Sequence, residues 1–304
     1  MNLEQLRLFA CVAEYGSLTK AAVALDSQQS VVSRQLSSLE AEFGGRLFYR
    51  TGRGVSLTEL GTTLLPRAQR LLRDIEDLAE DMKAHADVPG GDVRFGILPA
   101  FSYPLVNQLY RQTRERYPRV KLHLFEGSNG QLQEWVASGR VDIALLYRYE
   151  SIDSASERVL GKTDAYLVGS AGDRVTSQPT ITFRELENLP LVVPSTPNAL
   201  RSSLDQLARR AGISLTIAME ADSLPIQKSI VADGGLYTII GRQAVTREID
   251  TGLLQASRIV DPAIERTAIL LATTQRSYTI ATRAVTGLIE PLAINLLARY
   301  PANS

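Results

Sequence analysis

The stretch GSLTKAAVALDSQQSVVSRQLSSLEAEFGGRLFYRTGRGVSLTEL, residues 16–60, decides how the N-terminal part of this chain folds. Ser17 can cap a short first helix, because its hydroxyl can accept a hydrogen bond from an unpaired amide of the first turn. Residues 26–29 form a polar break, and a second helix is expected to run from there to Phe43. The glycine pair 44–45 then ends this helix, since glycine readily adopts a left-handed conformation. The pattern predicts two helices joined by a tight turn.

The second helix has one apolar face and one polar face. At helical spacing its core face should consist of Val32, Leu36, Leu39 and Phe43, packed against a small apolar face of the first helix made by Ala21, Ala22 and Leu25. The opposite face carries small hydroxyls and one arginine: Ser30, Ser33, Arg34 and Ser37. Such a face can enter a DNA major groove, where Arg34 or Gln29 could reach a base edge or a phosphate. The alternative is a helical hairpin whose outer face is only solvated.

A short hairpin is expected after the second helix. Two apolar runs, 47–49 and 55–57, flank Arg50-Thr51-Gly52-Arg53-Gly54, and the glycines supply the turn. With Arg46, the turn arginines make this hairpin positive, so it could straddle a phosphate backbone or reach the minor groove. A solvated surface hairpin is the alternative.

Four spaced segments of this region resemble a known family. They are AA-x-x-L (21–25), VSRQLSSLE (32–40), FGGRLFYR (43–50) and SLTELG (56–61), and together they are similar to the winged helix-turn-helix of the LysR-type transcriptional regulators. One departure is that Gln28, Gln29 and Ser30 stand where serine-glutamine-proline is usual. The candidate DNA-contacting residues are Ser17, Gln28, Gln29, Ser30, Ser33, Arg34, Ser37, Arg50 and Arg53.

Composition and charge limit the class of protein. The 304 residues suffice for two or three compact units, and 44% hydrophobic residues is ordinary for a globular protein. Lys plus Arg and Asp plus Glu both number 33, which excludes the global basicity of a protein that coats nucleic acid non-specifically. Tight DNA binding would therefore depend on where the arginines lie and on oligomerisation.

Residues 59–88 predict one long helix. Apolar residues recur within it at steps of three and four, typical of a coiled-coil seam: Leu60, Leu64, Ala68, Leu71, Ile75, Leu78 and Met82. Pro66 interrupts one backbone bond near its start. The seam favours pairing with a second copy, and the family resemblance also implies a linker helix that pairs two subunits. Packing against the C-terminal part of the same chain is the alternative.

After Pro89-Gly90-Gly91-Asp92 the pattern changes to strands alternating with helices. Strands are expected at 93–98, 120–126, 141–147, 165–170, 191–193, 215–221, 236–240 and 268–274, and helices at 103–117, 128–138, 197–211, 223–233, 242–250 and 279–299. This alternation predicts parallel sheets wrapped by helices in two α/β lobes. This half resembles the effector domain of the same family, which is similar to type 2 periplasmic binding proteins. EGSNGQLQEWVASGRVDIALLY (126–147) and VVPSTPNALRSSLD (192–205) resemble its nitrogen-assimilation-control branch.

The predicted domains follow from these segments. They are a winged helix-turn-helix over 1–58, a linker helix over 59–88, and an effector domain over 89–304. The resemblance implies that the effector domain has a first lobe of residues 92–161 and 268–304, and a second of residues 162–267.

Three loops are expected to meet at the cleft between the lobes, each at the start of a helix, where unpaired amides and the helix dipole hold anions. They contain Ala100, Phe101, Ser102 and Tyr103; Ser128 and Asn129; and Ser195, Thr196 and Asn198, with Arg201 one turn further. Tyr147 could add to an aromatic wall with Phe101 and Tyr103, and Tyr237 and Thr238 lie in a glycine-rich strand entry in which Gly241 stands where a proline is common in the family. The set predicts a small carboxylate as ligand. Each residue alone is also explained as an ordinary helix cap.

Catalysis and metal binding find little support in the sequence. His85 and His123 have no spaced metal partners, and the single Cys11, expected to be buried as a small apolar residue, excludes an internal disulfide. No Gly-x-Ser-x-Gly elbow or phosphate loop occurs, so we expect no enzyme, no metal and no cofactor.

The N-terminal run MNLEQLRLF is not expected to be a secretory signal. Glu4 and Arg7 interrupt the first apolar run, which argues against a secretory signal, and the sequence pattern predicts no membrane span. A cytoplasmic location is expected.

These observations predict a transcription regulator that binds an interrupted inverted repeat in double-stranded DNA as a dimer or tetramer. A small organic acid would shift the arrangement of its lobes, and RNA polymerase is a further candidate partner. Two other classes stay open: a solute-binding or transport-type protein with a helical leader, and a hydrolase that uses the cleft. The missing export signal and the arginine hairpin disfavour the first, and turnover of a ligand would identify the second.

Overall fold

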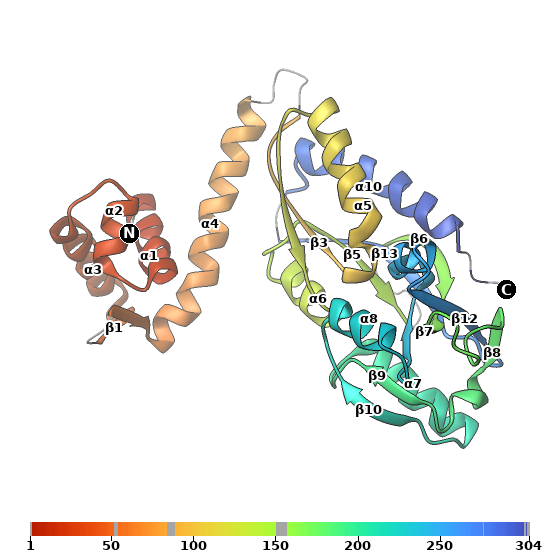
Figure 1. Ribbon diagram of the computed structural model, residues 1–304. Helices are drawn as coiled ribbons and strands as arrows, with labels where there is room; N and C mark the ends of the chain where they lie inside the picture. The colour runs from red at the N-terminus through yellow and green to blue at the C-terminus, as the bar shows by residue number, and fades with distance from the viewer. Residues whose placement is uncertain are drawn as a thin grey trace. The chain divides into compact units, whose positions relative to one another are not determined.

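The computed structural model describes residues 2–51, 54–83, 89–149, 157–275, 277–300 and 302. The chain divides into two compact units, residues 1–86 and 87–304 (Figure 1). Arg53, His85 and the linker residues beyond Lys83 lie outside the described residues, as do the side chains of Leu78 and Met82.

The first unit is three helices, a hairpin and a long helix: α1 (Leu3–Tyr15), α2 (Leu18–Ala24), α3 (Gln29–Phe43), β1 (Phe48–Thr51), β2 (Gly54–Leu57) and α4 (Glu59–Lys83). Ser17 caps α2, since its Oγ accepts a hydrogen bond from the Lys20 amide at 3.4 Å. Gly44 ends α3 with a left-handed φ of 67°. The predicted helix pair, its turn and the antiparallel hairpin are therefore confirmed.

The core of this unit lies between α1, α2, α3 and α4. Its fully buried members include Phe9, Val12, Ala21, Val32 and Leu39. The prediction of a core position was wrong for two residues: Leu25 is 39% exposed and Phe43 is 38% exposed. The reason is their position, because Leu25 is the C-cap of α2 and Phe43 is the last residue of α3, where the chain turns away from the core. Cys11 is half-buried rather than buried, and burial raises the pKa of its thiol.

Helix α4 shares its apolar side chains between two environments. Ala68 and Leu72 are buried in the core of the first unit, on the side where α4 packs against α1. Leu60 and Leu71 are exposed. The seven apolar residues predicted to form a coiled-coil seam therefore do not make one continuous exposed stripe, because Ala68 is buried in the core of its own unit.

The first lobe of the second unit is built on the sheet β4-β3-β5-β13-β6. Its elements are β3 (Gly90–Ile97), α5 (Pro99–Arg116), β4 (Arg119–Glu126), α6 (Asn129–Ala137), β5 (Ile143–Arg148), β6 (Glu157–Asp164), β13 (Glu265–Ala272) and α10 (Ile280–Ala298). Strands β4, β3 and β5 are parallel, as predicted, but β13 runs antiparallel to both β5 and β6. The expectation of purely parallel sheets was therefore wrong for this returning strand.

The second lobe contains the sheet β11-β7-β12-β8 and the parallel pair β9–β10. Its elements are β7 (Tyr166–Ser170), β8 (Thr180–Thr182), η1 (Phe183–Leu186), β9 (Pro190–Val193), α7 (Ala199–Ala211), β10 (Thr216–Glu220), α8 (Leu224–Ala232), β11 (Thr238–Ile240), η2 (Arg242–Ala244), α9 (Thr246–Asp250) and β12 (Leu254–Val260). Strand β7 pairs antiparallel with β11 and β12. Two buried clusters, around Phe183 and around Val231, form its core.

Helix α10 is long and apolar enough, by length and composition, to cross a membrane, which the sequence pattern had not predicted. Half of its most apolar window is buried, and side chains such as Val285, Leu288 and Ile289 lie in the core of the first lobe. It packs against α5, β6 and β3. These contacts identify α10 as a core helix of the lobe.

Candidate functional site

The outer face of α3 is open to solvent. Ser30, Arg34 and Ser37 are exposed and Ser33 is half-buried, while Val32, Leu36 and Leu39 on the other side are buried. The two faces are therefore separated as the sequence predicted. Ser30, Arg34 and Ser37 can therefore contact a large ligand directly.

The hairpin lies beside this face. The Arg50 guanidinium on β1 donates a hydrogen bond to Ser33 Oγ at 3.4 Å, which brings a hairpin arginine next to α3. Glu40, a residue that the sequence reasoning did not single out, accepts from the Leu47 and Phe48 amides at 2.7 and 3.3 Å. Its carboxylate thereby ties the start of β1 to α3 and fixes the distance between the hairpin and the exposed face.

The residues at the start of α3 have different surroundings. Gln28 occupies the N-cap position of α3 without a side-chain capping bond, and it is exposed. Gln29 Oε1 accepts a hydrogen bond from Thr19 Oγ1 at 3.3 Å, which orients its amide from α2. Ser17 is engaged in the cap of α2. Its hydroxyl is therefore already used for local structure.

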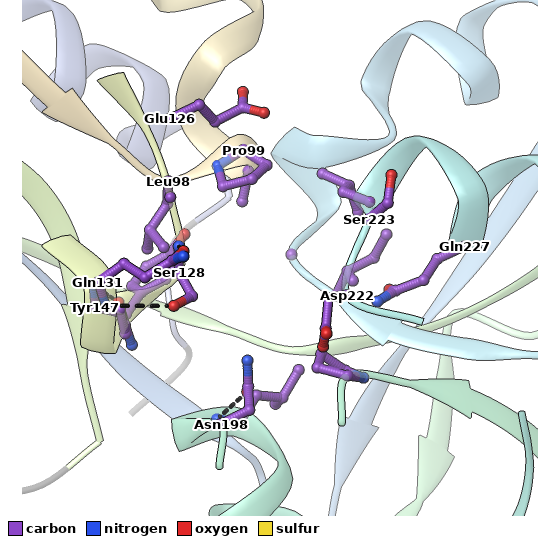
Figure 2. Close-up of a pocket in the computed structure, with 18 of the residues that line it drawn as sticks. Leu98, Pro99, Glu126, Ser128, Gln131, Tyr147, Asn198, Asp222, Ser223 and Gln227 are labelled. Carbon is purple, nitrogen blue, oxygen red and sulfur yellow. Dashed lines mark hydrogen bonds between the residues drawn. The ribbon is translucent and has the colours of Figure 1, made fainter. Parts of the chain in front are cut away.

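A pocket of about 480 Å³ lies between the two lobes of the second unit. Figure 2 shows first-lobe residues such as Ser128 and Tyr147 on one side of the space, and second-lobe residues such as Asp222 and Gln227 on the other. Of the predicted ligand residues, those that line it are Ala100, Ser128, Asn129, Tyr147 and Asn198. Those that do not line it are Phe101, Ser102, Tyr103, Ser195, Thr196, Arg201, Tyr237 and Thr238.

The first predicted loop contributes less to the pocket than expected. Helix α5 begins at Pro99 rather than near 103, and Tyr103 sits at a non-helical kink within it with an exposed side chain. Phe101 is fully buried and packs against the Tyr147 ring, with the centroids 4.7 Å apart. Ser102 Oγ donates to Glu126 Oε2 at 2.6 Å. Ser102 thus positions a carboxylate that itself lines the pocket.

The helix start at Ser128 is a closed capping box. Ser128 Oγ accepts from the Gln131 amide, and Gln131 Oε1 accepts from the Ser128 amide at 2.9 Å. Asn129 Oδ1 accepts from the Tyr147 amide at 3.1 Å, which joins α6 to β5. This helix start therefore fits the ordinary-cap alternative, with Asn129 as a structural tie.

The second-lobe loop is also built from caps and ion pairs. Asn198 caps α7, and Arg201 is neutralised by Glu220 at 2.7 Å and Asp205 at 3.2 Å. Ser195 donates from its amide and from its hydroxyl to Asp222. Arg201 is thus already paired with two carboxylates. Ser195 does not line the pocket itself, but its hydrogen bonds orient Asp222, which does.

The glycine-rich strand entry faces the interior of the second lobe. The Tyr237 hydroxyl donates to Asp173 at 2.9 Å, and burial raises the pKa of this phenol to about 12. Thr238 Oγ1 donates to Gln227 Oε1 at 3.0 Å. Gln227 lines the pocket whereas Thr238 does not, and the hydrogen bond from Thr238 orients the Gln227 side chain.

The pocket holds a cation that the sequence reasoning missed. Arg266 on β13 lines the pocket and is only 3% exposed. Its Nη2 donates to the Asp164 carbonyl at 3.0 Å, and its Cζ lies 4.4 Å from the centre of the Tyr147 ring. Tyr147 is hydrogen-bonded by Gln243, and burial raises its pKa to about 12, so this phenol stays neutral at ordinary pH. An arginine at the start of the apolar strand ERTAILLA is the signal that could have predicted a buried cation.

Other lining residues that were not predicted include Glu126, Tyr149 and Asp222. Tyr149 follows β5 and is hydrogen-bonded with Arg266, and burial raises its pKa. Gly241 lines the same pocket. Within the described part of the chain, no group of three acidic, histidine or cysteine side chains could hold a metal ion.

Comparisons with known proteins match both units. The family model described as "Bacterial regulatory helix-turn-helix protein, lysR family" matches residues 3–62, and the one described as "LysR substrate binding domain" matches residues 86–292. The HTH-type transcriptional regulator BbuR of Bordetella bronchiseptica is 27% identical over 271 residues, 89% of this chain and 83% of BbuR. The nitrogen assimilation regulatory protein nac of Klebsiella aerogenes is 29% identical over 245 residues, 80% of this chain and 79% of its own.

The fold matches a solved full-length regulator. The structure of CbnR complexed with its target DNA has a TM-score of 0.72 at 18% identity, and the match covers 97% of this chain and all of CbnR. This similarity shows the fold: a helix-turn-helix unit followed by a two-lobed domain of the periplasmic-binding type. The predicted fold class and the resemblance to the nitrogen-assimilation branch are confirmed.

Proposed function

Because the chain belongs to the LysR family of bacterial transcriptional regulators, we propose that it reads DNA through the outer face of α3 and responds to a small organic acid in the pocket between its lobes. The family identifies the chain as a transcriptional regulator with an effector-binding domain rather than as an enzyme. We propose, in addition, the kind of DNA site, the class of effector and the residues that contact each of them.

The observation that carries the DNA-binding proposal is the open flank of α3. Ser30, Arg34 and Ser37 are exposed together, and small side chains beside one arginine permit close approach to base edges in a major groove. Arg50 would then contact a neighbouring phosphate, because its hydrogen bond to Ser33 holds it beside this face. Gln28 and Gln29, at the start of α3, are placed to contact the backbone or an adjacent base.

We propose that two copies bind an interrupted inverted repeat through paired winged helices. The exposed Leu60 and Leu71 on α4 support a helix-to-helix contact between copies, since a long helix with bare apolar residues gains stability from a partner. Pairing also multiplies the affinity for DNA of a chain in which basic and acidic residues are equal in number. A tetramer of two such dimers, an interaction with RNA polymerase and a cytoplasmic location belong to the same proposal.

We propose that the effector acts by bridging the lobes. Residues of both lobes line the pocket, so a ligand that binds one lobe arrangement better than another shifts the population toward it. Glu126 and Asp222, which line the pocket, are exposed, so such a ligand can enter from solvent. The factor by which the ligand changes DNA affinity cannot exceed the ratio of its affinities for the two arrangements, and DNA changes ligand affinity by that same factor.

The test is selection of duplexes from random DNA by the purified full chain, followed by footprinting on the enriched sequence. We expect protection of an inverted repeat with half-sites about one or more helical turns apart, which is roughly 34 Å per turn. The same footprint is then repeated with small carboxylic acids that stabilise the protein in a thermal-shift screen. An altered footprint with one of them would support the effector role.

Two outcomes would contradict the proposal in different places. Enrichment of no sequence above the input would count against DNA reading by α3. Enrichment with a footprint that no stabilising small molecule alters would count against the effector role of the pocket alone.

A further inference from the structure

Arg266 lines the pocket, and no carboxylate of the described residues pairs with it. Its guanidinium is buried, its Nε has no hydrogen-bond partner, and no Asp or Glu of the described residues lies within ion-pair distance of it. The neighbouring Asp164 carboxylate pairs with Arg258 at 3.3 Å. Burial of a charge is costly unless an opposite charge compensates it. The buried guanidinium is therefore suited to pairing with an anion.

Gly241 lets the second-lobe backbone pack directly against this guanidinium. A Cβ at this position would lie 2.5 Å from Arg266 Nη2 and from the Gln243 amide, so any other residue would displace them. Glycine stands here where the family resemblance implies a proline. The departure leaves second-lobe backbone close to the guanidinium with no side chain between them.

The rim of the same pocket is acidic. Glu126 at the end of β4 and Asp222 after β10 are exposed and line the pocket. Figure 2 places Glu126 above the first-lobe residues and Asp222 on the opposite side of the space. Their hydrogen-bond partners are the neutral Ser102 and Ser195, and no Lys or Arg of the described part of the chain pairs with either. The rim thus has two carboxylates that lack a cation.

We propose that the effector is a zwitterion, a small amino acid whose carboxylate pairs with Arg266 and whose ammonium group meets Glu126 and Asp222. The proposal rests on the pocket being the effector site, as proposed above, and it specifies the ligand class. A dicarboxylate would put its second anion toward two acidic groups, and a simple amine would put its cation beside Arg266. Leu98, Ala100 and Ile240 supply an apolar wall for the remainder of the ligand.

The two charges of such a ligand would connect the lobes. Arg266 and Glu126 belong to the first lobe, while Asp222 and Gly241 belong to the second. An ammonium group shared between Glu126 and Asp222 would favour an arrangement in which both carboxylates are close to it. A plain monocarboxylate would satisfy Arg266 without this second connection.

The test is isothermal titration of the full chain with each standard L-amino acid. For every amino acid that binds, its deaminated acid, its decarboxylated amine and succinate are titrated as probes. We expect at least one amino acid to bind, and each single-charge analogue and succinate to bind about tenfold or more weakly, since a charge-assisted contact contributes roughly 1.5–3 kcal/mol.

Variants separate an anchoring role from a structural one. Arg266→Gln should weaken the amino acid about tenfold or more, and Arg266→Lys should retain more of the affinity. The exposed double variant Glu126→Gln/Asp222→Asn should lose the preference for the amino acid over its deaminated acid. This reversal of selectivity is not expected from a general loss of stability, and it does not depend on folding of the Arg266 variants.

Binding of no amino acid would overturn the inference, as would tighter binding of the deaminated acid or of succinate by the unaltered chain. In the latter case the proposed effector site stands if that acid alters the DNA footprint. A footprint that no bound probe alters would count against the effector role itself.

Discussion

Arg34→Ala is expected to reduce affinity for the selected DNA about tenfold or more at each half-site, and to relax the sequence preference at the contacted base. Arg34 is the one arginine on the exposed α3 flank, and a bidentate contact from such a residue to a base contributes roughly 1–3 kcal/mol of discrimination. Fluorescence anisotropy at fixed salt, with the selected duplex and with point variants of it, measures both effects.

Arg7→Ala provides the matched control for Arg34. Arg7 is also an exposed arginine of the first unit, but it lies on α1 rather than on the α3 flank. It should leave sequence preference unchanged. Equal losses for the two variants, with preference retained in both, would assign Arg34 a general electrostatic role and contradict base reading.

Gly61→Ala is expected to destabilise the first unit and with it DNA binding. Gly61 lies in the first turn of α4, and a Cβ there would overlap the Leu47 carbonyl oxygen and approach Leu57 Cδ2 at 2.9 Å. Its amide also donates to Thr58 Oγ1 at 3.0 Å, at the corner where the hairpin joins α4. Overpacking of this kind costs about 1–3 kcal/mol, because backbone must move to relieve it.

Hydrogen exchange measured by mass spectrometry resolves this effect by unit. Peptides from residues 2–51 should exchange faster in the Gly61 variant, while those from the second unit keep their protection. Gly287→Ala is the control, because Gly287 lies in α10 with no atom within 4 Å of an added Cβ. Unchanged exchange in residues 2–51 of the Gly61 variant would show that the corner tolerates a side chain.

Local chemistry made the first unit predictable. Ser17 as a cap and Gly44 as a helix end are properties of single residues and their near neighbours, so the pattern predicted α2, α3 and the turn between them. The same reasoning misjudged Leu25 and Phe43, because periodicity identifies a face but not where a helix end leaves the core.

The second unit was predicted less completely because its strands depend on distant partners. Strand β6 has the polar sequence ERVLGKTD, yet it pairs with β13, a hundred residues away, at the edge of the sheet. Strand β12 was missed in the same way: it has the mixed sequence LQASRIV and is held between β7 and β8. Neither pairing leaves a signal in the local pattern.

The pocket shows the same limit. Helix starts were recognisable, so Ser128 and Asn198 were found, but their side chains proved to be engaged in caps. Arg266 was missed because its burial results from Tyr147, Tyr149 and Gly241, which come from other segments of the chain. The sequence pattern identified the loops, whereas only the assembled lobes show which charged side chains line the pocket.

Photo-crosslinking measures directly whether the Ser30–Ser37 flank of α3 lies against DNA. A benzophenone side chain is placed at Ser37 or at Phe43, which is partly exposed and about 180° around the helix from Arg34. Irradiation with the selected duplex should yield a strong protein–DNA crosslink from position 37 and little from position 43. Crosslinks of equal yield, or from position 43 alone, would contradict it.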